Sequence, residues 1–124
     1  MIGYVTLGTN DLQRAAKFYD AICGELGVKR MFDTETFIAW GEPGGGAGIG
    51  LTKPYDGNAA TVGNGVMVAL QAKDSAQVNR IYNLAISMGA KCEGKPGPRE
   101  GIPGFYAGYF RDLDGNKLNA FIMG

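Results

Sequence analysis

The chain has 124 residues, 45% of them hydrophobic and 19% charged, which is typical of one compact globular domain or of two small halves sharing a core. Its 12 basic residues equal its 12 acidic ones and form no basic run, which argues against nucleic acid as a principal partner. No apolar run approaches the roughly 20 residues of a membrane span, and the N-terminus lacks the plan of a signal peptide, so we expect a cytoplasmic protein without a membrane partner.

The first expected elements are a strand over residues 2–8 and a helix that starts soon after it. Residues alternate in hydrophobicity along the strand, which places Val5 and Leu7 on one face and Tyr4 on the other. The apolar stripe of the helix comprises Leu12, Ala15, Ala16, Tyr19, Ile22, Cys23 and Leu26. Gly27 suits the left-handed position that follows a helix.

The start of this helix has two candidate caps. Asn10 and Asp11 can each accept a hydrogen bond from the first helical turn. Gln13 lies three residues after Asn10, as in a capping box. The sequence alone leaves the choice between the two open.

Three strands and a linker complete the first half. Extended segments are expected over residues 29–32 and 36–40, and residues 49–51 form the returning strand. The glycine run at residues 41–46 is not a phosphate-binding loop, because neither a Lys-Ser/Thr pair nor a helix follows it. A hairpin turn explains these glycines better. Residues 53–65, rich in Pro, Gly, Asn and Thr, are the expected linker.

The second half repeats the plan of the first. Its opening strand over residues 66–72 begins near Met67, as the first strand begins near Tyr4, and 63 residues separate these two positions. Asp74 and Gln77 then form a capping box. The second apolar stripe comprises Val78, Ile81, Tyr82, Ala85 and Met88.

Three more strands end the chain. A short strand over residues 91–93 leads into a Pro- and Gly-rich loop over residues 94–104, which forms either the rim of a pocket or a plain surface connection. An aromatic-rich strand over residues 105–111 and a last strand over residues 117–122 make a hairpin.

This order of elements predicts an α+β fold within a single domain. Module 1 takes about residues 1–55 and module 2 about residues 66–124, with the linker between them. Two mixed sheets, each with one helix on its outer face, can pair so that their inner faces enclose a cleft.

The side-chain inventory limits the chemistry. Because the chain contains no histidine, imidazole acid/base catalysis is excluded, and zinc, nickel or non-haem iron would have to bind carboxylates, amides or tyrosine. Cys23 and Cys92 are too few and too far apart in sequence for a disulfide scaffold or a metal cluster, so both are expected as free thiols. Asp112 and Asp114 lack the spacing of a calcium loop and are expected in a turn.

Motifs at both ends of the chain carry a family resemblance. They are residues 4–12 with Phe18 and Tyr19 on the helix, and residues 110–118 preceded by residues 104–107. With the repeated βαβββ plan, they resemble the glyoxalase/bleomycin-resistance/extradiol-dioxygenase group, the vicinal oxygen chelate superfamily, over essentially the whole chain. The resemblance implies paired modules, usually in a homodimer, whose curved sheets surround a small-molecule cavity where the family's enzymes bind a divalent metal.

The resemblance also indicates where the metal ligands would lie. They are typically histidines at the start of the first strand of a module and a glutamate in the last strand, and these positions fall on Tyr4, Met67 and Asn119. A neutral phenol, a soft thioether and a neutral amide are poor ligands for a hard divalent ion. We therefore expect a degenerate metal site and no cofactor.

The same positions mark the expected cavity. Strand alternation sends Tyr4, Met67 and Asn119 to the face opposite the helices, where they suit an apolar or aromatic ligand or simply fill the old site as core packing. The predicted ligand-binding residues are Tyr4, Met67, Asn119, Trp40, Tyr106 and Tyr109. About half of the aromatic residues should instead pack between layers or at a dimer interface. Arg99 and Glu100 either gate an anionic ligand or form a solvated pair.

Two functions from different classes follow. The first is a metal-independent small-molecule binding protein, similar to the bleomycin-resistance branch and acting as a homodimer. The alternative is a glyoxalase-like enzyme, a lyase, isomerase or thiol transferase, with a non-standard metal site or none, because fold alone does not settle function. A scaffold with a collapsed cavity is a third reading.

Overall fold

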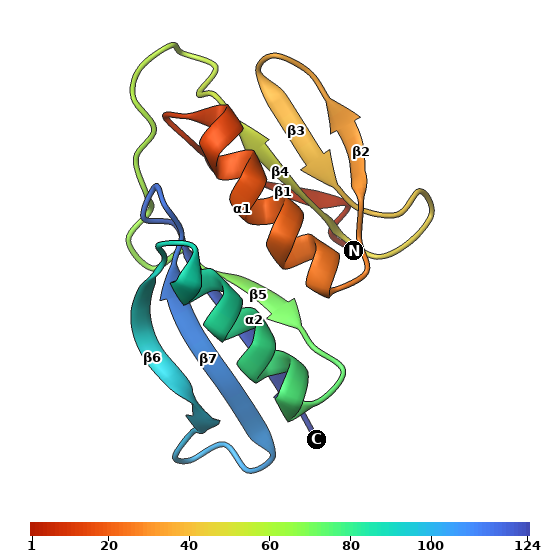
Figure 1. The fold of residues 1–124 in the computed structure, drawn as a ribbon, viewed down its shortest axis with the longest axis vertical. Coiled ribbons are helices and arrows are strands. Elements are labelled where there is room, and N and C mark those ends of the chain that lie inside the picture. The colour runs from red at the N-terminus through yellow and green to blue at the C-terminus, as the bar shows by residue number, and fades with distance from the viewer. The chain divides into compact units, whose positions relative to one another are not determined.

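Two units, Met1–Val62 and Gly63–Gly124, make up the computed structural model, which describes all 124 residues. The boundary falls inside the linker expected over residues 53–65. Each unit has one four-stranded sheet and one helix, which lies across one face of that sheet (Figure 1). The predicted pair of βαβββ modules is confirmed.

The first unit contains a mixed sheet with its first and last strands side by side. Its elements are β1 (Tyr4–Gly8), α1 (Leu12–Glu25), β2 (Arg30–Asp33), β3 (Phe37–Trp40) and β4 (Gly48–Thr52). The strand order is β1-β4-β3-β2. Strands β1 and β4 pair in parallel, and the other pairs are antiparallel. Two parallel strands need a long connection, and here the chain passes through α1, β2 and β3 between β1 and β4.

The second unit has the same topology. Its elements are β5 (Val68–Gln71), α2 (Ser75–Ser87), β6 (Lys91–Pro98), β7 (Phe105–Arg111) and β8 (Lys117–Met123). The strand order is β5-β8-β7-β6, with β5 parallel to β8. The internal repeat seen in the sequence is therefore a repeat of complete sheets.

Most strand bounds differ from the expectation by one or two residues, and two of the differences bear on the site. Strand β6 does not end at residue 93 but continues to Pro98, because its pairing with β7 resumes after each of two register shifts. Strand β5 begins at Val68, so Met67 lies before the strand rather than in it.

The two helices start with an aspartate cap. Asp11 accepts a hydrogen bond from the backbone N–H of Arg14 at 3.2 Å, whereas Asn10 accepts one from the N–H of Ala60 at 2.7 Å. The structure thus settles the choice for Asp11, and Asn10 with Gln13 forms no capping box.

The second helix comes closer to the expected box. Asp74 accepts from the N–H of Gln77 at 2.8 Å, and the side chain of Gln77 accepts from the N–H of Lys73 at 2.9 Å. The side chain reaches one residue further back than in a standard box.

Both helices also end alike. Gly27 and Gly89 follow the last turn with φ of 77° and 103°, in the left-handed region that favours glycine. The next N–H donates to the helix carbonyl five residues earlier, at 2.8 Å after Gly27 and at 3.0 Å after Gly89. These bonds satisfy carbonyls that a helix end leaves unpaired.

The apolar stripes bury against the sheets. The buried residues of α1 are Leu12, Ala15, Ala16, Phe18, Tyr19, Ile22 and Cys23, and those of α2 are Gln77, Val78, Ile81, Tyr82 and Ala85. Full burial of a side chain such as Ile22 or Ile81 contributes about 1.5–3 kcal/mol. Neither helix is long and apolar enough to cross a lipid bilayer.

Candidate functional site

Each sheet has one face under its helix, and we call the opposite face the open face. In the first unit, Ile38 of β3 pairs with Leu51 of β4, and both side chains are fully buried under α1. The neighbouring pairs, Phe37 with Thr52 and Ala39 with Gly50, point to the opposite face because successive residues of a strand alternate. Tyr4 joins them there.

A pocket of about 550 Å³ lies on this open face. Its aromatic lining consists of Tyr4, Phe32 and Phe37, and the thioether of Met31 adds to it. The ring of Phe37 meets those of Tyr4 and Phe32 edge to face, with both centroid separations at 6.5 Å. Such packing is favourable between aromatic rings, so the three rings form one apolar surface, which we call the aromatic pocket.

Glycines make room for these rings. A Cβ atom on Gly50 would lie 2.7 Å from the ring of Phe37, a distance that side chains do not tolerate. The loop at residues 41–46, between β3 and β4, forms another wall of the pocket, and Glu42 is its one charged lining residue. The glycine run predicted to form a hairpin turn therefore also shapes the pocket.

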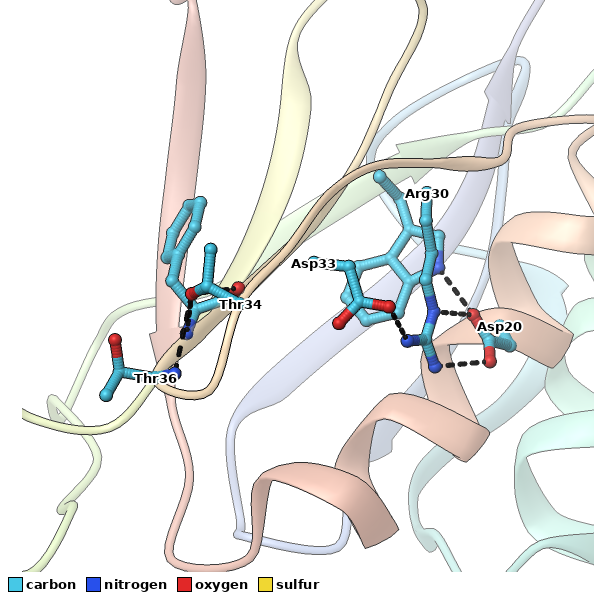
Figure 2. A network of polar contacts seen from close by, with 7 residues as sticks. Asp20, Arg30, Asp33, Thr34 and Thr36 are labelled. Atoms are coloured by element: carbon cyan, nitrogen blue, oxygen red, sulfur yellow. Dashed lines mark hydrogen bonds and ion pairs between the residues drawn. The ribbon is translucent and has the colours of Figure 1, made fainter.

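A threonine fixes the turn that presents Phe37. The hydroxyl of Thr34 donates to the carbonyl of Phe37 at 2.9 Å and accepts from its N–H at 3.0 Å (Figure 2). These two bonds pin both backbone groups of Phe37 at the start of β3. The ring therefore projects from a hydrogen-bonded turn at the start of β3.

Trp40 lies on the other face of the same sheet. Its side chain is 1% exposed, and its Nε1 donates to Oδ1 of Asp20 on α1 at 2.9 Å. Trp40 therefore packs against the helix and does not line the aromatic pocket, in keeping with its position two residues from Ile38.

The carboxylate of Asp20 is held by a second donor. Figure 2 shows the guanidinium of Arg30 between Asp20 and Asp33. Its Nε and Nη2 each lie 2.8 Å from an oxygen of Asp20, and its Nη1 lies 2.8 Å from Asp33. The hydrogen bonds from Arg30, and a smaller contribution from Trp40, hold the pKa of Asp20 below its ordinary value. This network joins α1 to β2 and β3.

The second unit separates the two predicted tyrosines. Tyr109 pairs in register with Asn119 and lies on the open face, whereas Tyr106 lies on the helix face, where its hydroxyl donates to Oδ1 of Asn79 on α2 at 2.7 Å. The helix face of β7 is also marked by Gly108, because a Cβ atom there would meet Tyr82 of α2. Tyr106 is thus a packing residue of the layer under α2.

Asn119 is buried with an unmet hydrogen-bonding capacity. The residue is 1% exposed, and its Oδ1 has no hydrogen-bond partner. Tyr4 and Met67 differ from it, being 65% and 39% exposed. A buried oxygen without a partner costs about 1–3 kcal/mol, so Asn119 is a position that a ligand group could satisfy.

These residues do not fit the divalent metal that the resemblance implies. Asn119 offers one neutral oxygen, Met67 a thioether and Tyr4 a phenol, and no group of three or more Cys, Asp or Glu side chains is placed to hold a metal ion. Nothing in this donor set supplies the negative charge that replaces the hydration of a divalent cation.

Three large apolar side chains of the aromatic pocket are not among the residues predicted from the sequence. Phe37 could have been found, because it alternates with the core residue Ile38. Two glycines of β4, Gly48 and Gly50, also fall on the open face opposite β3, which signals space above them. Met31 and Phe32 belong to a strand without clear alternation, and the register shift in β2 explains why.

Comparison with known proteins gives a consistent result. The family model for the Glyoxalase/Bleomycin resistance protein/Dioxygenase superfamily matches residues 1–120. A crystal structure of a glyoxalase/bleomycin resistance protein from Albidiferax ferrireducens T118 is 34% identical, with a TM-score of 0.88, and the match covers 100% of this chain and 99% of that one. No curated protein shows a significant sequence match.

Two more distant structures share the fold. A glyoxalase/bleomycin resistance protein/dioxygenase family enzyme from Burkholderia phytofirmans PsJN is 16% identical, with a TM-score of 0.78 and coverage of 98% of both chains. Lactoylglutathione lyase from Agrobacterium tumefaciens is 19% identical, with a TM-score of 0.70 and coverage of 98% of this chain and 92% of that one. At these identities the likeness concerns the fold alone.

Proposed function

We propose a metal-independent, small-molecule-binding function for this chain, which belongs to the Glyoxalase/Bleomycin resistance protein/Dioxygenase superfamily. The aromatic pocket of the first unit is the observation that carries this proposal. Its volume of about 550 Å³ falls within the range of about 300–1,000 Å³ that is usual for small-molecule sites.

The lining indicates the chemistry of the ligand. Tyr4, Phe32 and Phe37 offer ring faces and edges, Met31 offers a polarisable thioether, and Glu42 is the single charge. Aromatic contacts contribute about 0.5–1.5 kcal/mol each beyond the burial of area. An apolar or aromatic ligand, oriented by a few hydrogen bonds to groups such as the Tyr4 hydroxyl, suits such a surface.

A ligand screen tests binding directly. Small aromatic compounds should raise the melting temperature of the full chain, because a ligand that binds only the folded state stabilises it by mass action. Phe37→Ala should weaken binding of these compounds, whereas Tyr55→Ala, a change at a fully exposed ring outside the pocket, should not. A screen without stabilising compounds would support a scaffold with a collapsed cavity instead.

Metal analysis tests the other half of the proposal. Purified protein should contain no stoichiometric Ni, Zn, Mn or Fe, because the residues at the family's ligand positions carry no negative charge. One equivalent of any of these metals, lost in Asn119→Ala, would contradict the proposal. Turnover of a methylglyoxal–glutathione adduct that EDTA abolishes would favour the enzymatic alternative.

The homodimer implied by the resemblance is part of the same proposal. Light scattering should give twice the chain mass of 13.1 kDa. A mass equal to one chain at micromolar concentration would remove the dimer from the proposal and leave the aromatic pocket unaffected, because all its lining residues belong to one unit.

A further inference from the structure

A second hollow, of about 520 Å³, lies in the second unit and shares no residue with the aromatic pocket. The residues lining it are Glu93, Gly94, Lys95, Arg99, Tyr109 and Lys117. It belongs to the open face of the sheet, because Tyr109 lies on that face. We call it the basic hollow.

Two cations share the ring of Tyr109. The guanidinium carbon of Arg99 lies 5.1 Å from the ring centroid, and the ammonium of Lys117 lies 5.6 Å from it. Each contact is attractive, yet the ring cannot remove the repulsion between the two charges. An anion placed beside both would do so.

Arg99 is held in place by neutral groups. Its Nη1 donates to the carbonyls of Gly97 and Pro98 at 3.1 and 3.3 Å, and its Nη2 donates to the carbonyl of Lys95 at 2.9 Å. These bonds fix the guanidinium without compensating its charge, and they leave part of its five N–H donors for another acceptor. A preorganised cation loses little entropy when it binds an anion.

A glycine permits this arrangement. A Cβ atom on Gly94 would lie 3.2 Å from Nη2 of Arg99 and 3.3 Å from the ring of Tyr109, and the φ of Gly94 is 156°. A side chain at Gly94 would therefore crowd both the guanidinium and the ring where they approach the backbone of β6.

The one carboxylate of the basic hollow is already engaged. Glu93 forms an ion pair with Arg111, and Arg111, with a smaller effect from Lys117, holds the pKa of Glu93 below its ordinary value. If the charge of Glu93 is assigned to Arg111, the positive charges of Lys95, Arg99 and Lys117 stay in excess.

The face changes character along β8. Lys117, Asn119 and Phe121 are alternate residues of this strand, so their side chains share the open face at intervals of about 7 Å. The buried oxygen of Asn119 lacks a partner, and the ring of Phe121 stacks on Phe105 at 5.8 Å. The face therefore passes from cationic, through a hydrogen-bond acceptor, to aromatic.

We propose that this face binds a small carboxylate with an apolar body and a hydrogen-bond donor. The carboxylate lies in the basic hollow beside Arg99 and Lys117, and the apolar body carries the donor at its far end toward Oδ1 of Asn119. A compound such as 4-hydroxybenzoate, with a carboxylate and a hydroxyl at opposite ends of an aromatic ring, has these three features.

An NMR titration of the full chain with 4-hydroxybenzoate tests this site. Saturable shifts should appear at backbone amides of β6, β7 and β8 near the basic hollow. Arg99→Gln and Lys117→Gln should each weaken binding at least fivefold, and Lys17→Gln, at an exposed position of α1, should not. The neutral analogue 4-hydroxybenzamide should bind at least fivefold more weakly, and added NaCl should weaken 4-hydroxybenzoate because charges are screened.

Several outcomes would overturn the inference. They are equal affinity of the neutral amide, unchanged affinity in Lys117→Gln, and the absence of saturable shifts in the second unit. Inorganic phosphate that binds there as tightly as 4-hydroxybenzoate would indicate a general oxyanion site and reject the apolar part. Shifts confined to the first unit would support the aromatic pocket while rejecting the basic hollow, so the two proposals fail separately.

Discussion

The indole Nε1 of Trp40 donates to Oδ1 of Asp20 at 2.9 Å, and Arg30 donates to both oxygens of the same carboxylate. Trp40 is the single tryptophan of the chain and is almost completely buried. Its fluorescence therefore reports on the contact between α1 and the sheet of the first unit.

Replacement of Asp20 should destabilise the first unit. In Asp20→Ala the buried indole N–H loses its acceptor and Arg30 loses one of its two carboxylates, which should lower the free energy of unfolding by about 1–3 kcal/mol. Asp20→Asn keeps an acceptor and should cost less. Urea denaturation followed by Trp40 fluorescence measures the stability of both variants, and Glu35→Gln at an exposed position is the control. Equal stability of Asp20→Ala and wild type would contradict a stabilising role for Asp20.

The same carboxylate sets a pH dependence. Because the pKa of Asp20 is lowered in the folded state, its contribution to stability is present above the ordinary value of 3.8 and is lost as pH falls through the folded-state pKa. The difference in the free energy of unfolding between wild type and Asp20→Asn should therefore shrink as pH falls below about 4. Denaturation at a series of acidic pH values, followed by Trp40 fluorescence, measures it. A difference that persists unchanged at lower pH would reject this assignment.

Gly50→Ala should impair the aromatic pocket. The added Cβ would lie 2.7 Å from the ring of Phe37, so the ring must rotate away from the sheet. Overpacking lowers the free energy of unfolding by about 1–3 kcal/mol. We expect a value near the lower end of this range, because the ring of Phe37 is partly exposed. Thermal-shift titration should show weaker binding of apolar aromatic compounds. Gly24→Ala, where a Cβ meets nothing and which lies outside the pocket, is the matched control.

The two thiols should differ in reactivity. Cys92 is exposed and Cys23 is buried, and burial, aided by the negative charge of Asp20, raises the pKa of Cys23 to about 12. A thiol reagent should therefore modify one cysteine in the native protein and two after denaturation. Rapid modification of both in the native state would show that α1 opens readily.

The buried thiol of Cys23 should make the protein less stable in alkali. A raised folded-state pKa means that the buried thiol stabilises the fold below the ordinary value of 9.0, and this contribution is lost between there and about pH 12. Cys23→Ala should show a smaller alkaline decline in the free energy of unfolding than wild type. Parallel declines in the two proteins would assign the effect to other groups.

Asn119→Leu should stabilise the second unit and weaken its ligand binding. The substitution removes a buried oxygen without a partner, which should raise the free energy of unfolding by about 1–3 kcal/mol. Loss of the acceptor should at the same time reduce the affinity for 4-hydroxybenzoate more than that for benzoate, which has no hydroxyl. Denaturation and NMR titration measure the two effects; a destabilised variant would mean that the amide is satisfied in the native state.

Asp112→Ala should destabilise the last hairpin. Oδ1 of Asp112 accepts from the N–H groups of Asp114 and Asn116, both at 2.9 Å, and Asp112 is buried. Removing the carboxylate leaves these donors without their acceptor, at a cost of about 1–3 kcal/mol. Added calcium should leave the melting temperature of wild type unchanged, since the carboxylate serves the turn.

The elements with strong periodicity could be predicted from the sequence. The apolar stripes that begin at Leu12 and Val78 predict both helices, and the alternation around Val5 predicts the first strand. Strand β6 could not be bounded, because its glycines and prolines form bulges whose partner residues lie on β7. The bounds of such a strand depend on its pairing with the neighbouring strand and not on its own residue pattern.

The candidate site was harder to predict. Strand alternation correctly predicts that Tyr4 lies on the face opposite the helix. Trp40 and Tyr106 are predicted as site residues because of their residue type. Strand alternation instead places them on the same face as the core residues Ile38 and Phe110. The pairing of Arg99 with Tyr109 depends on the path of β6 past Gly94. No sequence period reports such a contact, because it is set by tertiary structure.

The pairing of β1 with β4 and of β5 with β8 closes each sheet within a contiguous stretch of chain. No strand ladder depends on the covalent connection between the halves, so insertions within residues 53–65 leave every ladder intact. Two half-length polypeptides would contain the same ladders as this single one. Each half of the chain therefore carries a complete sheet of its own, as expected of a duplicated βαβββ unit.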